Sequence, residues 1–158
     1  ATVFCGTNRG NLRAYDLQQR TPEQLWIHNT TRPIRTILAI PPSTGRAGVV
    51  IAGSDSGYVC AFGQGGAPVW ATPLSSAVVV AEQVGASGRV LIAVACRDGH
   101  CFWLDRDGRV VAFAKCSGKI VAMSPLGPGR DGARDIAVAT QAPDAVVVLC
   151  TPLGADAH

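Results

Sequence analysis

The feature that most constrains this chain is a repeat of about 44 residues made of short apolar runs and turn residues. The first turn of three successive copies carries Gly10, Gly57 and Gly99. Near the end of the next run lie Tyr15, Phe62 and Trp103, and the run after that carries Trp26, Trp70 and Phe113. Self-similarity at this period indicates one supersecondary unit per copy, stacked on its neighbours.

The runs favour β-strands and not helices. Gly, Pro or β-branched residues interrupt every stretch long enough for a helix, and no period of 3.6 is sustained. Segments such as "RVLIAVA" and "AVVVLC" are strand-like, and Asp-Gly or Ser-Gly turns separate several of them. Most runs are apolar throughout, which is typical of a sheet covered on both faces by neighbouring sheets. The sequence therefore predicts an all-β fold: a β-propeller or partial propeller of about 3.5 to 4 four-stranded antiparallel blades.

The repeat also predicts blade boundaries. We expect one propeller region over 1–158, with blades at 1–30, 33–73, 76–115 and 118–151. The first blade lacks its leading strand and the last blade lacks its outer strand. We therefore expect the chain to be part of a longer protein, completed by further blades of the same or another chain.

Composition excludes several classes of function. Hydrophobic residues make up 47% of the chain, and no apolar run is long enough to span a membrane as a helix. The net charge is +3, but the basic residues are scattered, so nucleic-acid binding is not predicted. The six cysteines lie mostly in apolar runs, which favours buried thiols in a reducing compartment over metal ligands. We expect a cytoplasmic protein, with the cilium or flagellum included, rather than a secreted one.

Two segments resemble known propeller families. "GSDSGYVCAFGQGGAPVW" resembles a blade of the WD-repeat or pyrroloquinoline-quinone-type propellers. "GPGRDGARDIAVAT", from Gly127 to Thr140, resembles the FG-GAP repeat of integrin-α-type propellers. In that family the corresponding loop binds calcium through several acidic side chains. Here only Asp131 and Asp135 match those positions, so they are weak calcium candidates, and we predict neither a metal nor a cofactor.

Catalytic constellations are missing from the sequence. It contains no Gly-x-Ser-x-Gly elbow, no phosphate-binding loop and no acidic cluster beside a histidine. The sequence therefore predicts a protein that is not an enzyme. The alternative is a cofactor- or calcium-binding propeller domain of an enzyme, similar to a quinoprotein or to the tail of an adenylating enzyme.

Protein binding is the function that the sequence favours. In a propeller, the turns after the second strand share one face with the loops that join blades. That face would carry the candidate partner-binding residues Arg9, Arg32, Asp55 and Arg97. Arginines on a rigid rim suit an acidic or peptide partner. We predict a scaffold that binds other protein subunits in a larger intracellular assembly, because degenerate FG-GAP-like propellers resemble modules of ciliary, trafficking and nutrient-signalling complexes.

Overall fold

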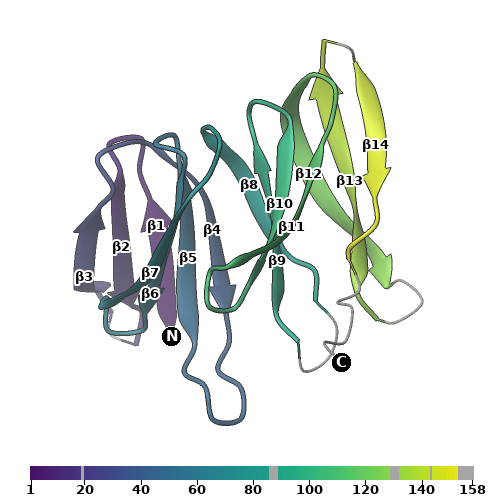
Figure 1. Cartoon of the computed structure of the whole chain (residues 1–158). Helices are drawn as coiled ribbons and strands as arrows, with labels where there is room; N and C mark the ends of the chain where they lie inside the picture. The colour runs from purple at the N-terminus through teal and green to yellow at the C-terminus, as the bar shows by residue number, and fades with distance from the viewer. Residues whose placement is uncertain (19, 86–88, 129–131, 143, 153–158) are drawn as a thin grey trace. The chain divides into compact units, whose positions relative to one another are not determined.

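The described residues form strands and turns without a helix. The structure is a computed structural model that describes residues 1–18, 20–85, 89–128, 132–142 and 144–152. These residues contain fourteen strands, and each pairs antiparallel with the next within its sheet (Figure 1). Within the described part, no helix is long and apolar enough to cross a membrane. The chain divides into two compact units, Ala1–Val79 and Val80–His158.

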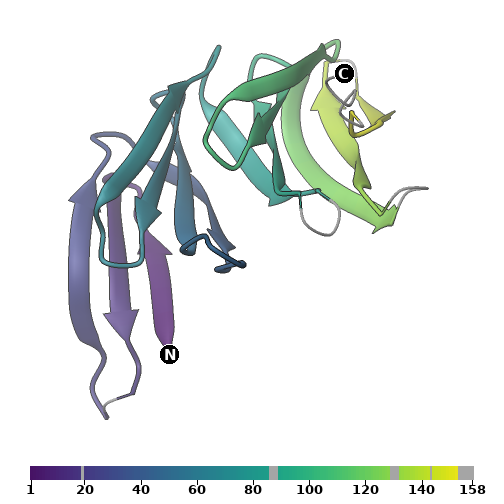
Figure 2. The same ribbon diagram turned by 60° about the horizontal axis from the view of Figure 1, so that its bottom comes forward.

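The first unit contains two sheets. One has the order β1-β2-β3, formed by β1 (Thr2–Gly6), β2 (Asn11–Asp16) and β3 (Glu23–Asn29). The other has the order β4-β5-β6-β7, formed by β4 (Ile34–Ile40), β5 (Val49–Ser54), β6 (Tyr58–Gly63) and β7 (Pro68–Pro73). Strand β1 contacts β4, so the two sheets pack against each other (Figure 2).

The second unit repeats this design. Its first sheet has the order β8-β9-β10-β11, formed by β8 (Val78–Gln83), β9 (Leu91–Cys96), β10 (His100–Asp105) and β11 (Val110–Lys115). Its second sheet has the order β12-β13-β14, formed by β12 (Lys119–Pro128), β13 (Arg134–Gln141) and β14 (Ala145–Leu149). Strand β12 contacts β9, and the backbone N–H of Arg134 donates to the carbonyl oxygen of Val84 at 2.8 Å.

The predicted turn glycines occupy the same position in three sheets. Gly10, Gly57 and Gly99 have φ angles of +81°, +78° and +96°, which glycine adopts without a steric penalty. Each glycine N–H donates to the carbonyl oxygen three residues earlier, at 3.1 to 3.2 Å. The acceptors are Thr7, Ser54 and Cys96. The glycines are therefore required by the backbone of the turn.

The aromatic residues of the repeat are aligned differently from the sequence prediction. Strands β2, β6 and β10 each have a register shift against the following strand, at Ala14/Tyr15, Ala61/Phe62 and Trp103/Leu104. The cross-strand pairs just before it are Ala14–Trp26, Ala61–Trp70 and Trp103–Ala112. Trp103 therefore occupies the position of Ala14 and Ala61. Ala112, rather than Phe113, occupies the position of Trp26 and Trp70. The third sheet keeps one large and one small residue in the pair but exchanges their strands.

Aromatic side chains join the two sheets of the first unit. Leu12 of β2 and Phe62 of β6 are buried in a common core, against which Phe4 and Trp26 pack. The ring of Trp26 lies 5.9 Å from that of Phe4 and 6.2 Å from that of Phe62, between centroids. The indole Nε1–H of Trp26 donates to the carbonyl oxygen of Gln64 at 2.8 Å. Trp26 therefore contributes apolar contact and a hydrogen bond to the same junction.

The core of the second unit lies between its two sheets. It contains Leu91, Ala93 and Trp103 from the first sheet and Ile136 and Val138 from the second. Trp103 is only 2% exposed, and its Nε1–H has no hydrogen-bond partner within the described residues. Burial of these β-branched and aromatic side chains is the main force that holds the sheets together.

Candidate protein-binding edge

One edge of three of the four sheets is built by the same hydrogen bond. The N–H of Thr30 donates to the carbonyl oxygen of Gly10 at 2.8 Å, that of Leu74 to Gly57 at 2.7 Å, and that of Cys116 to Gly99 at 2.9 Å. Each bond ties a turn to the connection that leads into the next sheet. We call these turns and connections the turn edge of each unit. Its segments are 7–10, 30–33, 54–57 and 74–77 in the first unit, and 96–99, 116–118, 141–142 and 144 in the second unit.

The first unit brings three of the predicted residues to its turn edge. Arg9 precedes Gly10, whose backbone is so close to the next connection that an added Cβ would lie 2.7 Å from the carbonyl oxygen of Arg32. The N–H of Asp55 donates to the carbonyl oxygen of Pro33 at 2.9 Å. Both arginines are exposed. Arg9, Arg32 and Asp55 therefore share one edge of this unit.

Asp55 is already paired within the chain. Its carboxylate accepts from Arg35 Nε at 2.9 Å and from Arg35 Nη2 at 2.5 Å. The Asp55 side chain is 17% exposed and that of Arg35 is 46% exposed. The hydrogen bond to Asp55 raises the pKa of the Arg35 guanidinium. Asp55 thus orients Arg35, a basic residue that sequence reasoning missed because the pair depends on the β4–β5 register.

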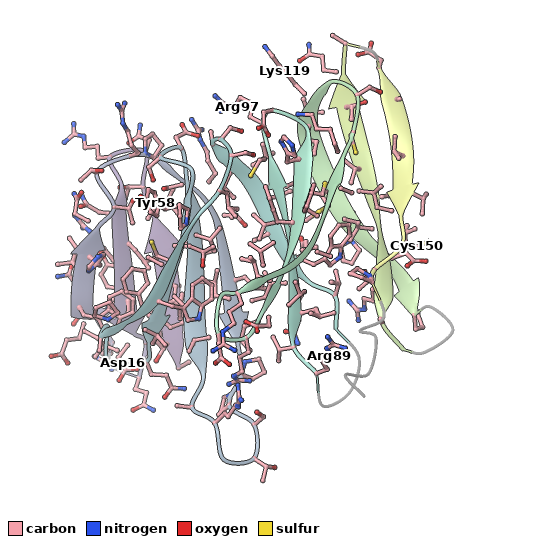
Figure 3. The ribbon with its side chains drawn as sticks, viewed as in Figure 1. Asp16, Tyr58, Arg89, Arg97, Lys119 and Cys150 are labelled. Atoms are coloured by element: carbon pink, nitrogen blue, oxygen red, sulfur yellow. The ribbon has the colours of Figure 1, made fainter. Side chains whose placement is uncertain are left out.

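In the second unit, Arg97 lies exposed on the β9–β10 turn beside a charged cluster. His100 Nδ1 lies 2.9 Å from Asp98 Oδ2, and Lys115 Nζ donates to the Asp98 carbonyl oxygen at 2.5 Å. Lys115 Nζ also lies 3.3 Å from His100 Nδ1. Figure 3 shows Arg97 and Lys119 near one end of these strands and Arg89 near the other. The Asp-Gly-His spacing was the only sequence signal for this cluster.

Positive charge is concentrated at the turn edge of both units. In the first unit, the turn edge and its flanking residues include three basic residues, Arg9, Arg32 and Arg35, and one acidic residue, Asp55. In the second unit the basic residues are Arg97, Lys115 and Lys119, and the acidic residues are Asp98 and Asp144. An excess of like charge on a rigid edge attracts a partner of opposite charge and raises the association rate.

Of the two weak calcium candidates, only Asp135 lies in the part of the chain that the structure describes. Asp131 lies outside the described residues. Asp135 Oδ1 accepts from the N–H of Thr151 at 3.0 Å, so this carboxylate holds the segment after β14. Within the described ranges, no three His, Cys, Asp or Glu side chains are grouped to hold a metal ion.

The cysteines divide into buried and exposed groups. Cys96, Cys101 and Cys116 are buried, as predicted, whereas Cys60 is half-buried and Cys5 and Cys150 are exposed. Desolvation, with smaller contributions from Cys116 and Cys96, raises the pKa of Cys101 to about 12. The thiolate is the reactive form of cysteine, so burial makes Cys101 unreactive.

We expect thiol labelling at pH 8 to separate these groups. With a pKa of about 12, only roughly one Cys101 thiol in 10⁴ is ionised at this pH, against about one in ten for a solvent-exposed thiol. An aromatic disulfide reagent should react rapidly with Cys5 and Cys150 and reach Cys101 only after unfolding. Mass spectrometry of quenched samples identifies the modified residues. Rapid native labelling of Cys101 would contradict the packing of the second unit.

Comparison with known proteins identifies the fold. No family model matches the chain, and no curated protein matches it in sequence. The structure is similar to that of Saccharomyces cerevisiae Sqt1, with a TM-score of 0.78 and 14% identity over 97% of this chain and 42% of that one. The fold is that of a β-propeller. This confirms the predicted fold class, an all-β partial propeller.

Two structures of Chaetomium thermophilum Sqt1 agree with this assignment. Free Sqt1 matches with a TM-score of 0.72 and 19% identity. Sqt1 bound to the N-terminus of the ribosomal protein L10 matches with a TM-score of 0.71 and 20% identity. Both alignments cover 87% of this chain and 38% of the Sqt1 chain. The chain therefore spans about two fifths of these propellers, and at such low identity the likeness concerns the fold alone.

Proposed function

We propose that this chain is part of a non-catalytic β-propeller that binds a protein partner through its turn edge. The observation that carries the proposal is the excess of exposed basic residues on backbone segments fixed by the repeated hydrogen bond to Gly10, Gly57 and Gly99. A fixed backbone lowers the entropy lost when side chains are ordered on binding. The propeller of Sqt1, which binds the N-terminus of L10, is a precedent for a protein ligand.

The charge of this edge defines the partner chemistry. Arg9, Arg32 and Arg97 are exposed, and guanidinium groups form paired hydrogen bonds with carboxylates. The partner is therefore an acidic protein segment. That this chain belongs to a ciliary, trafficking or nutrient-signalling assembly stays a prediction from the FG-GAP-like pattern. Completion of the ring by further blades of the same or another chain also stays a prediction.

Charge reversal at the turn edge tests this proposal. We expect the triple variant Arg9→Glu, Arg32→Glu, Arg97→Glu to lose its acidic partner, with a fall in affinity of at least about tenfold. The matched control reverses Arg20, Arg46 and Arg109, three exposed arginines at the opposite ends of the strands. Pull-down with quantitative mass spectrometry compares both variants with the original chain. If both variants retain the same partners, or lose them equally, the turn edge is not the binding site.

A further inference from the structure

Strand β11 is an edge strand without the prolines that protect β7 against pairing. Strands β3, β7 and β11 each lie at one side of their sheet and pair with one neighbour only. Such strands present unpaired backbone groups, which proteins commonly guard with proline or charged residues. Strand β7 begins and ends with proline, Pro68 and Pro73, and β3 begins with Glu23. The sequence of β11 is VVAFAK, without proline and with one charge at its end.

The direction of the free backbone groups follows from the hydrogen-bond pattern. In an antiparallel ladder, alternate residues turn both backbone groups toward the partner strand. The N–H of Cys116 donates to Gly99, so Ala114 and Ala112 are turned toward β10. The backbone groups of Phe113 and Lys115 consequently point away from the sheet. In β7 the position equivalent to Lys115 is Pro73, which has no N–H.

The side chains beside this free backbone form an apolar and aromatic platform. Phe113 is 69% exposed, and Val110 and Val111 are 44% and 45% exposed. The ring of Phe113 lies 6.4 Å from that of Phe102, which in turn lies 5.8 Å from His100, between centroids. An exposed phenylalanine held by neighbouring rings offers a large contact area at low entropic cost.

The platform continues into the basic turn edge. Lys115 ends β11 on the side of the Arg97 turn, and its ammonium group is fixed against the Asp98 carbonyl oxygen. Lys119 follows after the short connection and is exposed. A ligand that lies along β11 therefore meets positive charge at the Lys115 end and apolar surface beyond it.

We propose that β11 is a docking strand for an extended peptide, which adds to the β8–β11 sheet as a fifth strand. The peptide pairs its backbone with Phe113 and Lys115, places an apolar side chain on Phe113, and has acidic residues at the end next to Lys115 and Arg97. Main-chain bonds supply affinity in this mode, and the side chains supply specificity. The inference rests on the proposed function and specifies how the acidic partner binds in the second unit.

The test uses one peptide selected from a phage-displayed random library against the purified chain and then labelled with fluorescein. We expect acidic residues followed by alternating apolar residues in the selected peptide. On binding, hydrogen exchange at the Phe113 amide should slow, while exchange at Ala71, the equivalent position in β7, should not change. Phe113→Ser should weaken binding by at least about tenfold.

Two substitutions at Lys115 separate charge from backbone pairing. Lys115→Gln removes the charge and keeps the N–H, whereas Lys115→Pro removes both and reproduces the proline of β7. We expect Lys115→Pro to bind about fivefold more weakly than Lys115→Gln, the effect of one backbone hydrogen bond. Circular dichroism and native exchange at the buried strand β9 verify that both variants are folded. Equal affinities of the two variants would overturn strand addition.

The outcomes distinguish this inference from the proposed function. If Arg97→Glu abolishes peptide binding but exchange at Phe113 is unchanged by the peptide, the turn edge binds the partner and β11 does not. If the peptide protects Phe113 and the turn-edge variant binds normally, strand docking stands and the turn-edge proposal fails. If no peptide is selected, the docking strand is overturned, and the pull-down of the triple variant still decides the turn edge.

Discussion

Trp103→Ala is expected to destabilise the second unit by about 3–5 kcal/mol, whereas Trp103→Phe should change its stability by less than about 1 kcal/mol. The ring is buried between the two sheets, so its removal leaves a cavity. The indole N–H, however, has no partner within the described residues. Phenylalanine keeps most of the apolar contact and removes a buried donor that costs about 1–3 kcal/mol when unpaired.

The measurement is urea unfolding, followed by circular dichroism and by exposure of the Cys101 thiol, which lies in the same core. Trp26→Phe in the first unit is the matched control, because the Nε1–H of Trp26 is bonded to Gln64. Loss of the Trp26 Nε1–H should lower the free energy of unfolding by about 1 kcal/mol more than loss of the Trp103 Nε1–H. A large loss of stability on Trp103→Phe would show that the indole N–H makes a bond that the structure lacks.

Gly99→Ala is expected to cost at least about 3 kcal/mol, more than the conformational penalty of a positive φ alone, which is about 1–2 kcal/mol. A Cβ at this position would lie 2.6 Å from the carbonyl oxygen of Gly118 and 2.7 Å from that of Cys116. Both are backbone atoms in the connection to the next sheet, so they cannot rotate out of the way.

Gly45→Ala is the control for this prediction. Gly45 also has a positive φ, +74°, but an added Cβ would have no atom within 4 Å. Its replacement should therefore cost only the conformational penalty, about 1–2 kcal/mol. Thermal unfolding of both variants gives the comparison. Equal losses would mean that the turn relaxes away from the connection and that the two are not rigidly joined.

The sequence predicted the fold class and the turn positions because both depend on local chemistry. A glycine between two apolar runs allows the positive φ that a tight turn needs, and Gly10, Gly57 and Gly99 have that conformation. Runs apolar on both faces indicate a sheet that is covered on both faces, and the lack of helical periodicity indicates that the covering layers are other sheets. These signals are contained in a few consecutive residues, so no knowledge of distant contacts was needed.

The alignment of the aromatic residues failed because it depends on register. All three sheets have the same register shift after the aligned pair, so the shift does not distinguish the third copy. Matching by residue type pairs Trp70 with Phe113, whereas the cross-strand pairs make Ala112 the equivalent of Trp70. In the third sheet the large residue of this pair, Trp103, lies on β10. In the other two sheets the large residue, Trp26 or Trp70, lies on the outer strand. Spacing along the chain cannot reveal such an exchange, because only the cross-strand pair keeps the volume constant.

The candidate edge was predicted in outline and missed in detail. Arg9, Arg32 and Asp55 share an edge because turns and connections alternate regularly in an antiparallel meander. Arg35 was missed because its bond to Asp55 joins residues twenty positions apart. Lys115 was missed for the same reason, since it meets Asp98 across the β10–β11 pair. Long-range side-chain contacts require a register that the sequence alone did not supply.

The tie between each turn and its following connection has a consequence for how the chain tolerates change in length. On the bonded side, one additional residue would break the contact that Gly10, Gly57 or Gly99 makes with the connection. On the other side, the loop between β4 and β5 contains the Ser43–Arg46 bridge, and Gly45 faces open space. Insertions, epitope tags and fused domains should therefore be accepted at Gly45 and rejected at the glycine turns.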